Sequence, residues 1–279
     1  MNPTLQAHAF HPAGKLPNQG HYTREAIVIA LKNLGLKPGD TVFTHCNLGF
    51  LGKLQGATQP ADYYAVFKSA FFEVLGVQGT WIMPTFSYSF CRKQPFDVRR
   101  TPGVCGALAE ALRQDVQARR YADANFSVAA IGARAIEMTA NPPDHSFGPN
   151  SFWDRFLKSQ GKFCNINFDA GSTFIHYAEK RLNVPYRYDK AFEGVLTDGD
   201  GQSHPRQFIH FVYDLEKAED GPEFSLFDQR AKKAGLAQTE NLGKGQLVCI
   251  SAEDTLGLIA ETLPETPDFL TAKALTRTQ

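Results

Sequence analysis

Short apolar segments alternate with segments of helical periodicity along the first two thirds of the chain. Residues 41–44, 79–84, 126–131 and 162–166 have the composition of buried strands. Between them, apolar residues recur at helical spacing, which predicts helices over 23–34, 60–75 and 101–113 and around His176. Strands that alternate with helices favour a layered α/β fold.

Local signals support the predicted helix ends. Thr23 can cap the first helix, and Gly35 can end it. Thr101 can cap the third helix, and Pro102 would then be its first residue. Proline costs no hydrogen bond at that first position.

From residue 192 onward the pattern changes. Segments 194–196 and 207–213 flank an Asp-Gly-Asp-Gly turn at 198–201, which predicts an antiparallel hairpin. A strand over 245–250 and a helix over 254–263 follow. Because the chain shows no repeat, low-complexity tract or linker, we expect one domain over 1–279.

Composition narrows the function. The 279 residues contain 29 Lys plus Arg and 29 Asp plus Glu, so the formal net charge is zero and nothing suggests a nucleic-acid binder. No apolar run approaches the about 20 residues that span a bilayer. The five cysteines are scattered without a Cys-x-x-Cys pair, which supports neither a disulfide framework nor a zinc site. The polar segment 1–20 lacks the apolar core of a secretory signal. We therefore expect a cytoplasmic protein without a structural metal.

A histidine and a glutamate stand three residues apart in Gly171-Ser172-Thr173-Phe174-Ile175-His176-Tyr177-Ala178-Glu179. In a helix, His176 and Glu179 share a face. A carboxylate beside an imidazole fixes its tautomer and stabilises its protonated form, as a general base requires. The alternative is an ordinary ion pair on a helix surface.

Six segments in order resemble the aminoglycoside 3-N-acetyltransferase family, also known as the antibiotic N-acetyltransferases. The last segment carries the family's Thr-x-x-His-x-x-Glu motif. The segments are 39–49, 79–87, 95–106, 125–132, 145–151 and 173–179. The resemblance implies transfer of an acyl group from acetyl-coenzyme A, or another acyl-coenzyme A, to an amine on a sugar ring. It also implies a central mixed β-sheet flanked by helices, with the hairpin as an addition, and no metal.

The resemblance also implies roles for individual residues. His176 is the base, Glu179 supports it, and Thr173 polarises the thioester carbonyl or merely caps the helix. Candidate coenzyme-binding residues are His45, Asn47, Leu48, Gly49, Ser127 and Ser151. Candidate acceptor-binding residues are Asp97, Asp123 and Arg187. For most of these, a structural role is an open alternative: a buried His45, a strand serine at Ser127, a turn aspartate at Asp97.

Three departures from the family pattern concern the acceptor and the loop after the first strand. They are Asp123-Ala124, Cys46-Asn47 and Ser151-Phe152. The first adjoins the expected acceptor site. Together with Arg119, Arg120, Arg187 and Lys190, whose positive charge suits phosphate, it favours a nucleotide-linked amino sugar over an aminoglycoside.

Three alternatives stay open at this point. They are an aminoglycoside 3-N-acetyltransferase that confers antibiotic resistance, a coenzyme A thioester hydrolase and a carbohydrate-binding module without activity. A nucleophilic Cys46 activated by His45 is disfavoured because neighbouring strand residues face opposite sides. The sequence leaves a homodimer open.

Overall fold

The main sheet of the computed structural model is mixed, as the family resemblance implied. Within the described residues, 21–214 and 221–276, it has seven strands in the order β11-β12-β8-β2-β4-β7-β6. β2 runs parallel to β4 and β8, whereas the outer strands pair antiparallel. The bounds are β2 (Thr41–Phe43), β4 (Thr80–Pro84), β6 (Arg119–Arg120), β7 (Val128–Gly132), β8 (Lys162–Ile166), β11 (Gln238–Leu242) and β12 (Gly245–Ser251).

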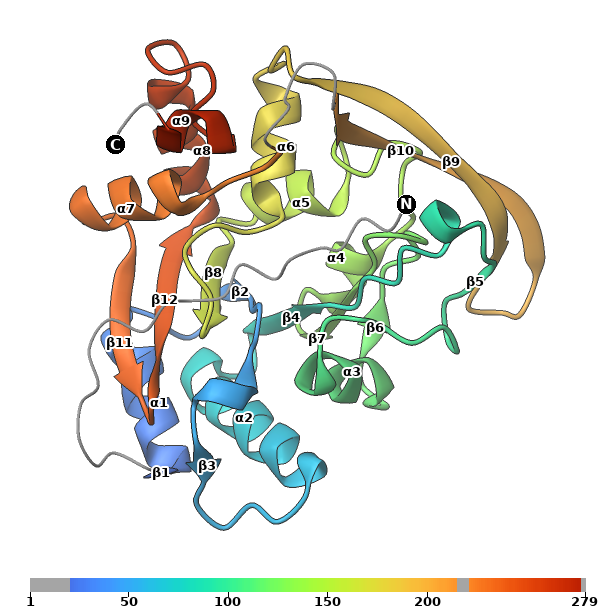
Figure 1. The fold of residues 1–279 in the computed structure, drawn as a ribbon. Helices are drawn as coiled ribbons and strands as arrows, with labels where there is room; N and C mark the ends of the chain where they lie inside the picture. Colours follow the sequence, from blue (N-terminus) through green and yellow to red (C-terminus); the bar gives the residue numbers. More distant parts are fainter. Residues whose placement is uncertain (1–20, 215–220, 277–279) are drawn as a thin grey trace.

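Helices cover both faces of this sheet (Figure 1). One face carries α1 (Arg24–Asn33), α2 (Pro60–Leu75) and α3 (Ala107–Gln114). The opposite face carries α4 (Ala135–Thr139), α5 (Phe152–Lys158), α6 (Phe174–Arg181), α7 (Ser225–Lys233) and α8 (Ala252–Thr262), and α9 (Ala272–Thr276) follows near the C-terminal end. The sheet is therefore the middle layer of three.

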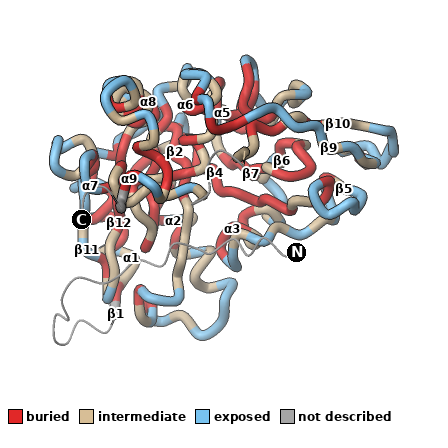
Figure 2. Tube along the Cα trace, turned by 45° about the horizontal axis from the view of Figure 1, so that its top comes forward, coloured by how far each residue is buried: buried red, intermediate tan, exposed pale blue. Residues whose placement is uncertain are grey.

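The strands alternate between two hydrophobic cores because successive side chains point to opposite faces. Trp81 and Met83 pack on the α1–α3 side, whereas Ile82 between them packs on the other side. Central strands β2 and β4 are buried along their whole length, as Figure 2 shows. Burial on both faces explains why these strands are continuous apolar runs in the sequence.

A long hairpin lies beyond the β6 end of the main sheet (Figure 1). It consists of β9 (Arg187–Thr197) and β10 (Ser203–Tyr213), and β5 (Phe96–Asp97) pairs with β9. It is longer than predicted, because residues 188–193 are largely exposed and polar and carry no apolar alternation. A small core containing Phe90, Phe96 and Phe208 fixes it to the rest of the molecule. The remaining short elements are β1 (His21–Tyr22), β3 (Lys53–Leu54), η1 (Leu48–Phe50) and η2 (Phe90–Arg92).

Most predicted elements are confirmed within a few residues. The Thr23 hydroxyl accepts from the Ala26 N–H as the cap of α1, at 3.1 Å. The prediction of a helix from residue 101 was wrong: 101–106 is a loop and α3 begins at Ala107. Gly106 has φ 101°, which no helix contains, and the Thr101 hydroxyl instead accepts from the Asp97 N–H at 2.8 Å. Helices α4, α5, α7 and α9 were not predicted.

The expectation about residues 1–20 falls outside the described part of the chain. Across the described ranges, none of the helices combines the length and apolarity that a membrane span requires.

We predict that Gly132→Ala destabilises the protein by about 2 kcal/mol or more, because it strains the β4–β7 pairing. Gly132 has φ 121°, and an added Cβ would lie 2.1 Å from the Gly79 carbonyl oxygen. Urea denaturation measures the change. Gly199→Ala, where a Cβ meets nothing within 4 Å, is the matched control and should shift stability by less than about 0.5 kcal/mol. Equal effects of the two changes would contradict this.

Candidate active site

The candidate site lies at the edge of the sheet where β2, β4 and β8 end. These three strands are parallel, so their carboxyl ends meet at one edge, where α/β proteins bind ligands. His45 follows β2, Phe86 follows β4 and Phe168 follows β8. Phe126 comes just before β7, whose antiparallel direction brings its start to this same edge.

An aromatic wall formed by Phe86, Phe126 and Phe147 joins the two candidate histidines. Ring centroids lie 6.4 Å apart for His45 and Phe86, 5.3 Å for Phe86 and Phe126, and 5.0 Å for Phe126 and Phe147. The last step, from Phe147 to His176, is 5.6 Å edge to face. His45 and His176 therefore lie at opposite ends of one continuous row of aromatic ring contacts.

His176 and Glu179 lie on one face of α6, as predicted. The Nδ1 atom of His176 is 3.1 Å from Oε2 of Glu179. A third residue joins them: Arg187, the first residue of β9, places Nη2 2.8 Å from that same Nδ1 and Nε 2.8 Å from Oε2 of Glu179. The Tyr186 hydroxyl donates to the other carboxylate oxygen at 3.0 Å. The inner nitrogen of His176 thus faces an anion and a cation together.

These groups differ sharply in exposure. The Glu179 side chain is 0% exposed and that of Arg187 4%, whereas that of His176 is 22% exposed. Burial and the Arg187 cation lower the pKa of His176, and Glu179 opposes them only partly. The outer nitrogen, Nε2, is not sealed from solvent, in contrast to Nε2 of His45. His176 therefore presents a mostly neutral imidazole to solvent at neutral pH.

Thr173 lies one turn before His176, and its carbonyl accepts from the His176 N–H at 3.1 Å. Its hydroxyl makes no capping bond to α6, although the residue occupies the N-cap position. The capping alternative is therefore not what the geometry shows, and the hydroxyl is available to a ligand.

The loop after β2 combines a buried imidazole with a short 3-10 helix. Nε2 of His45 is sealed from solvent and lacks a hydrogen-bond partner in the described ranges, and burial lowers the His45 pKa to about 4. Burial raises the pKa of the Cys46 thiol, which agrees with the expectation that this cysteine is not a nucleophile. Asn47 precedes η1 and its side chain makes no capping bond, whereas the Leu48 N–H bonds the Cys46 sulfur.

Two serines that were predicted to contact the coenzyme make hydrogen bonds within the protein. The Ser127 side chain is fully buried, donates to the Thr85 carbonyl at 2.6 Å and accepts from Arg120 at 2.9 Å. Ser151 is also fully buried and caps α5 by accepting from the Asp154 N–H at 3.3 Å. Both side chains hold the fold at this edge, and the geometry does not support direct contact with a ligand.

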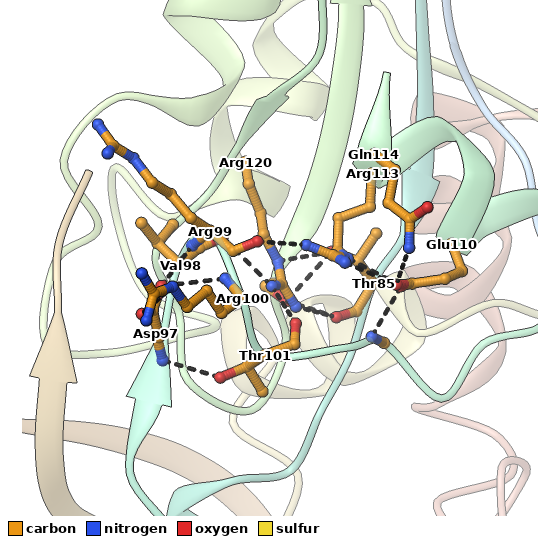
Figure 3. Close-up of polar contacts among 12 residues, drawn as sticks. Thr85, Asp97, Val98, Arg99, Arg100, Thr101, Glu110, Arg113, Gln114 and Arg120 are labelled. Atoms are coloured by element: carbon orange, nitrogen blue, oxygen red, sulfur yellow. Dashed lines mark hydrogen bonds and ion pairs between the residues drawn. The ribbon is translucent and has the colours of Figure 1, made fainter. Parts of the chain in front are cut away.

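Arg120 is the centre of a polar network beside the site (Figure 3). Its guanidinium donates to the carbonyls of Thr85, Val98 and Thr101, and burial lowers its pKa to about 9. Asp97 lies in the adjoining loop, where one carboxylate oxygen accepts from the N–H groups of Arg99 and Arg100 at 2.8 and 3.0 Å. Asp97 therefore forms the turn that was its alternative assignment.

Asp123 is a buried hydrogen-bond acceptor. Its side chain is 1% exposed and accepts from the N–H groups of Asn125 and Phe126 at 2.8 and 2.9 Å. The Ser146 hydroxyl donates to its second oxygen. The carboxylate shapes the loops that hold the aromatic wall, and its role in acceptor binding stays a prediction.

Arg187 likewise is buried beneath His176 and is not placed to touch an acceptor. Sequence reasoning missed this contact because Arg187 belongs to a strand eight residues beyond Glu179. It also missed His210 of β10, which is buried against Phe126 at 4.8 Å and bonded to the Asn125 amide at 3.0 Å. Its only sequence signal is the alternation of β10.

No cluster of three or more His, Cys, Asp or Glu side chains that could hold a metal occurs in residues 21–214 or 221–276.

Comparisons with known proteins agree with the resemblance found in the sequence. A family model described as aminoglycoside 3-N-acetyltransferase matches residues 43–264. Aminoglycoside N(3)-acetyltransferase IX of Micromonospora chalcea is 26% identical over 252 residues, which cover 82% of this chain and 83% of that protein.

Solved structures share the fold. Aminoglycoside acetyltransferase AAC(3)-Xa superposes with a TM-score of 0.76 at 24% identity, covering 90% of this chain and 95% of that chain. AAC-IIIb in a binary complex with CoASH gives a TM-score of 0.72 at 20% identity, covering 88% and 97%. The mixed α/β architecture expected from the sequence is thereby confirmed.

We predict that Asp123→Ala lowers the unfolding free energy by about 3 kcal/mol, because three buried donors lose their acceptor. Chemical denaturation with intrinsic fluorescence measures the change. Asp144→Ala is the control: that carboxylate is half exposed in an ion pair with Arg206, and its loss should cost less than about 1 kcal/mol. A fully stable Asp123→Ala protein would show that the carboxylate is not a structural anchor.

Proposed function

Because this chain belongs to the aminoglycoside 3-N-acetyltransferase family, we propose that it transfers the acetyl group of acetyl-coenzyme A to a ring amine of an aminoglycoside-type amino sugar. It is an N-acetyltransferase with acetyl-coenzyme A as its co-substrate. The observation that carries the proposed mechanism is the His176 imidazole, whose inner nitrogen is held by Glu179 and Arg187 while its outer nitrogen is open.

In the proposed reaction, Nε2 of His176 takes a proton from the acceptor amine as its nitrogen attacks the thioester carbon. A C–N bond forms, the C–S bond breaks, and the coenzyme leaves as its thiol after taking up a proton. A bound amine is mostly protonated near neutral pH and cannot attack without a base. The free hydroxyl of Thr173, on the same face as His176, is the candidate donor to the developing oxyanion.

For the coenzyme, we propose the loop that contains His45, Asn47, Leu48 and Gly49. The support is the sealed His45 nitrogen, which lacks a hydrogen-bond partner in the described residues, at the carboxyl end of a parallel strand, where α/β proteins bind ligands. The aromatic wall connects this loop to His176 through ring contacts, which places the proposed coenzyme loop and the proposed base at the two ends of one cluster.

The acceptor proposed from the family replaces the nucleotide-linked amino sugar favoured by the sequence. That expectation depended on free positive charge near the site. Arg187 is instead paired with Glu179, and Arg120 is saturated by carbonyl and hydroxyl oxygens. Lys190 lies over the Phe192 ring. Arg119 is exposed and Lys190 keeps its charge. Because Arg120 and Arg187 are committed to protein partners, however, the argument for a nucleotide phosphate is weaker and the relatives' substrate is the better choice.

We predict acceptor-dependent release of coenzyme A thiol from acetyl-coenzyme A when kanamycin or gentamicin is present. A thiol reagent measures the release, and mass spectrometry locates the acetyl group. A panel of nucleotide-linked amino sugars tests the earlier expectation. Turnover of those sugars alone would overturn the proposed acceptor, and thiol release without any acceptor would identify a thioester hydrolase.

We predict that His176→Ala lowers kcat by roughly 100-fold or more, since it removes the general base, and leaves the KM for acetyl-coenzyme A nearly unchanged. Glu179→Gln should lose less activity because the base remains. The base acts only when unprotonated, so wild-type kcat rises with pH through the His176 pKa. That limb should lie below 6.5, because burial and Arg187 lower this pKa. Steady-state kinetics across pH measure both effects. If His176→Ala kept its turnover and its pH profile, His176 would not be the base, and His45 would be tested next.

A further inference from the structure

The contact between Arg187 and His176 raises a question about where the imidazole proton lies. We propose that Arg187 is a positioning residue that holds resting His176 as the tautomer protonated on Nε2, so that the base forms only when the proton moves to Nδ1, facing Glu179. The catalytic meaning of this step depends on the proposed function. The tautomer itself is a property of the unliganded protein.

The argument follows from donor and acceptor chemistry. A guanidinium nitrogen can only donate, and a carboxylate oxygen can only accept. Both contact Nδ1 of His176, Nη2 of Arg187 at 2.8 Å and Oε2 of Glu179 at 3.1 Å. Nδ1 of a neutral imidazole either carries a proton or offers a lone pair, so only one of the two contacts is a hydrogen bond. The shorter contact, from Arg187, assigns the lone pair to Nδ1 and the proton to Nε2.

Neither neighbour is free to move away. Nη1 of Arg187 donates to the Phe211 carbonyl at 2.9 Å, and the guanidinium carbon lies 3.9 Å from the centre of the Tyr213 ring. Glu179 is held by Tyr186 through its other oxygen. The imidazole is therefore the group that changes: Nε2 gives its proton to water and Nδ1 takes one up, so the ring stays neutral while its tautomer switches. An ammonium that donates to Nε2 favours the Nδ1–H tautomer, so the acceptor itself would switch the base on.

The charge balance around His176 supports this assignment. Glu179 and Arg187 are the charged groups in direct contact with the ring, and they form an ion pair with each other. His210 on β10 is buried, with its pKa lowered to about 4, so it adds no charge at neutral pH. The carboxylate therefore does not dominate, and an imidazolium formed at His176 faces a cation. Such an imidazolium gives its proton up readily, as transfer to the departing thiolate requires.

The other titratable groups on the surrounding elements have partners of their own. Lys180, one turn along α6, and His145, beside the aromatic wall, both bond Asp189 of β9. Glu223, next to Phe224, accepts from the Ser225 N–H at 2.7 Å. The pH response of the site is thus expected to come from His176.

The first experiment locates the proton directly. Long-range 1H–15N correlation spectra of 15N-labelled, unliganded wild-type protein are recorded at mildly alkaline pH, with His176→Gln to assign the signals. We expect Nδ1 of His176 at the shift of an unprotonated nitrogen and Nε2 at that of a protonated one. In Arg187→Met the two should exchange. A protonated Nδ1 in the wild type would overturn the proposal.

The second experiment measures the consequence for catalysis. Arg187→Met removes the cation that lowers the His176 pKa, so the acid limb of the kcat profile should move up by about one pH unit or more. Turnover should fall near neutral pH and recover at alkaline pH. Arg187→Lys, which keeps the charge, should shift the limb less. A uniform loss at every pH, with an unmoved limb, would show a merely structural arginine and overturn the proposal.

The matched control is Arg134→Met, which breaks an exposed Arg–Glu pair outside the His176 site, with Arg134 and Glu137 at 3.1 Å. Its pH profile should match the wild type. If Arg187→Met fails to fold because Glu179 is left without its cation, the wild-type spectrum alone still decides the tautomer. Full activity of His176→Ala would defeat the proposed base, whereas the spectrum would still test the hydrogen bond from Arg187.

Discussion

The ion pair between Glu179 and Arg187 is the interaction on which this site depends. Both side chains are almost completely excluded from water, which costs several kcal/mol per charge unless partners compensate. Tyr186, the Phe211 carbonyl and His176 provide those partners. The pair also ties α6 to both strands of the hairpin. The packing of the hairpin and the orientation of His176 therefore depend on the same contacts, so a change in either one alters the other.

The sheet supplies the second requirement, a common edge. Because β2, β4 and β8 are parallel, the residues that follow them arrive together although they are far apart in the sequence. Asp123, Ser127 and Ser151 are buried and bonded within the protein. They fix the loops that carry the aromatic wall, and so act on the site through its shape.

The sequence was sufficient to predict the elements that depend on local interactions. The buried strands, α1, α2 and the His176–Glu179 pair follow from apolar periodicity, caps and helical spacing, and all lie close to where they were predicted. The sequence did not reveal contacts between residues that are far apart along the chain. Arg187 meets His176 only after β9 folds back, and Asp123 becomes a buried acceptor only when the Ser146 loop closes over it. The start of α3 was misplaced because Gly106 takes a backbone conformation that a capping pattern at Thr101 does not reveal.

The two cores on opposite faces of the sheet differ in their relation to the site. The core on the far side from α1, α2 and α3 includes Phe147, which contacts His176, and Tyr186, which bonds Glu179. The described contacts place no residue of the α1–α3 core against His176, Glu179 or Arg187. Substitutions under α1–α3 reach the site only through the loop after β2, because Cys46 and Leu48 pack against that core. Substitutions in the opposite core change residues that contact His176 and Glu179 directly. Divergence among related chains should therefore be tolerated unevenly, with the α1–α3 core freer to change except beneath that loop.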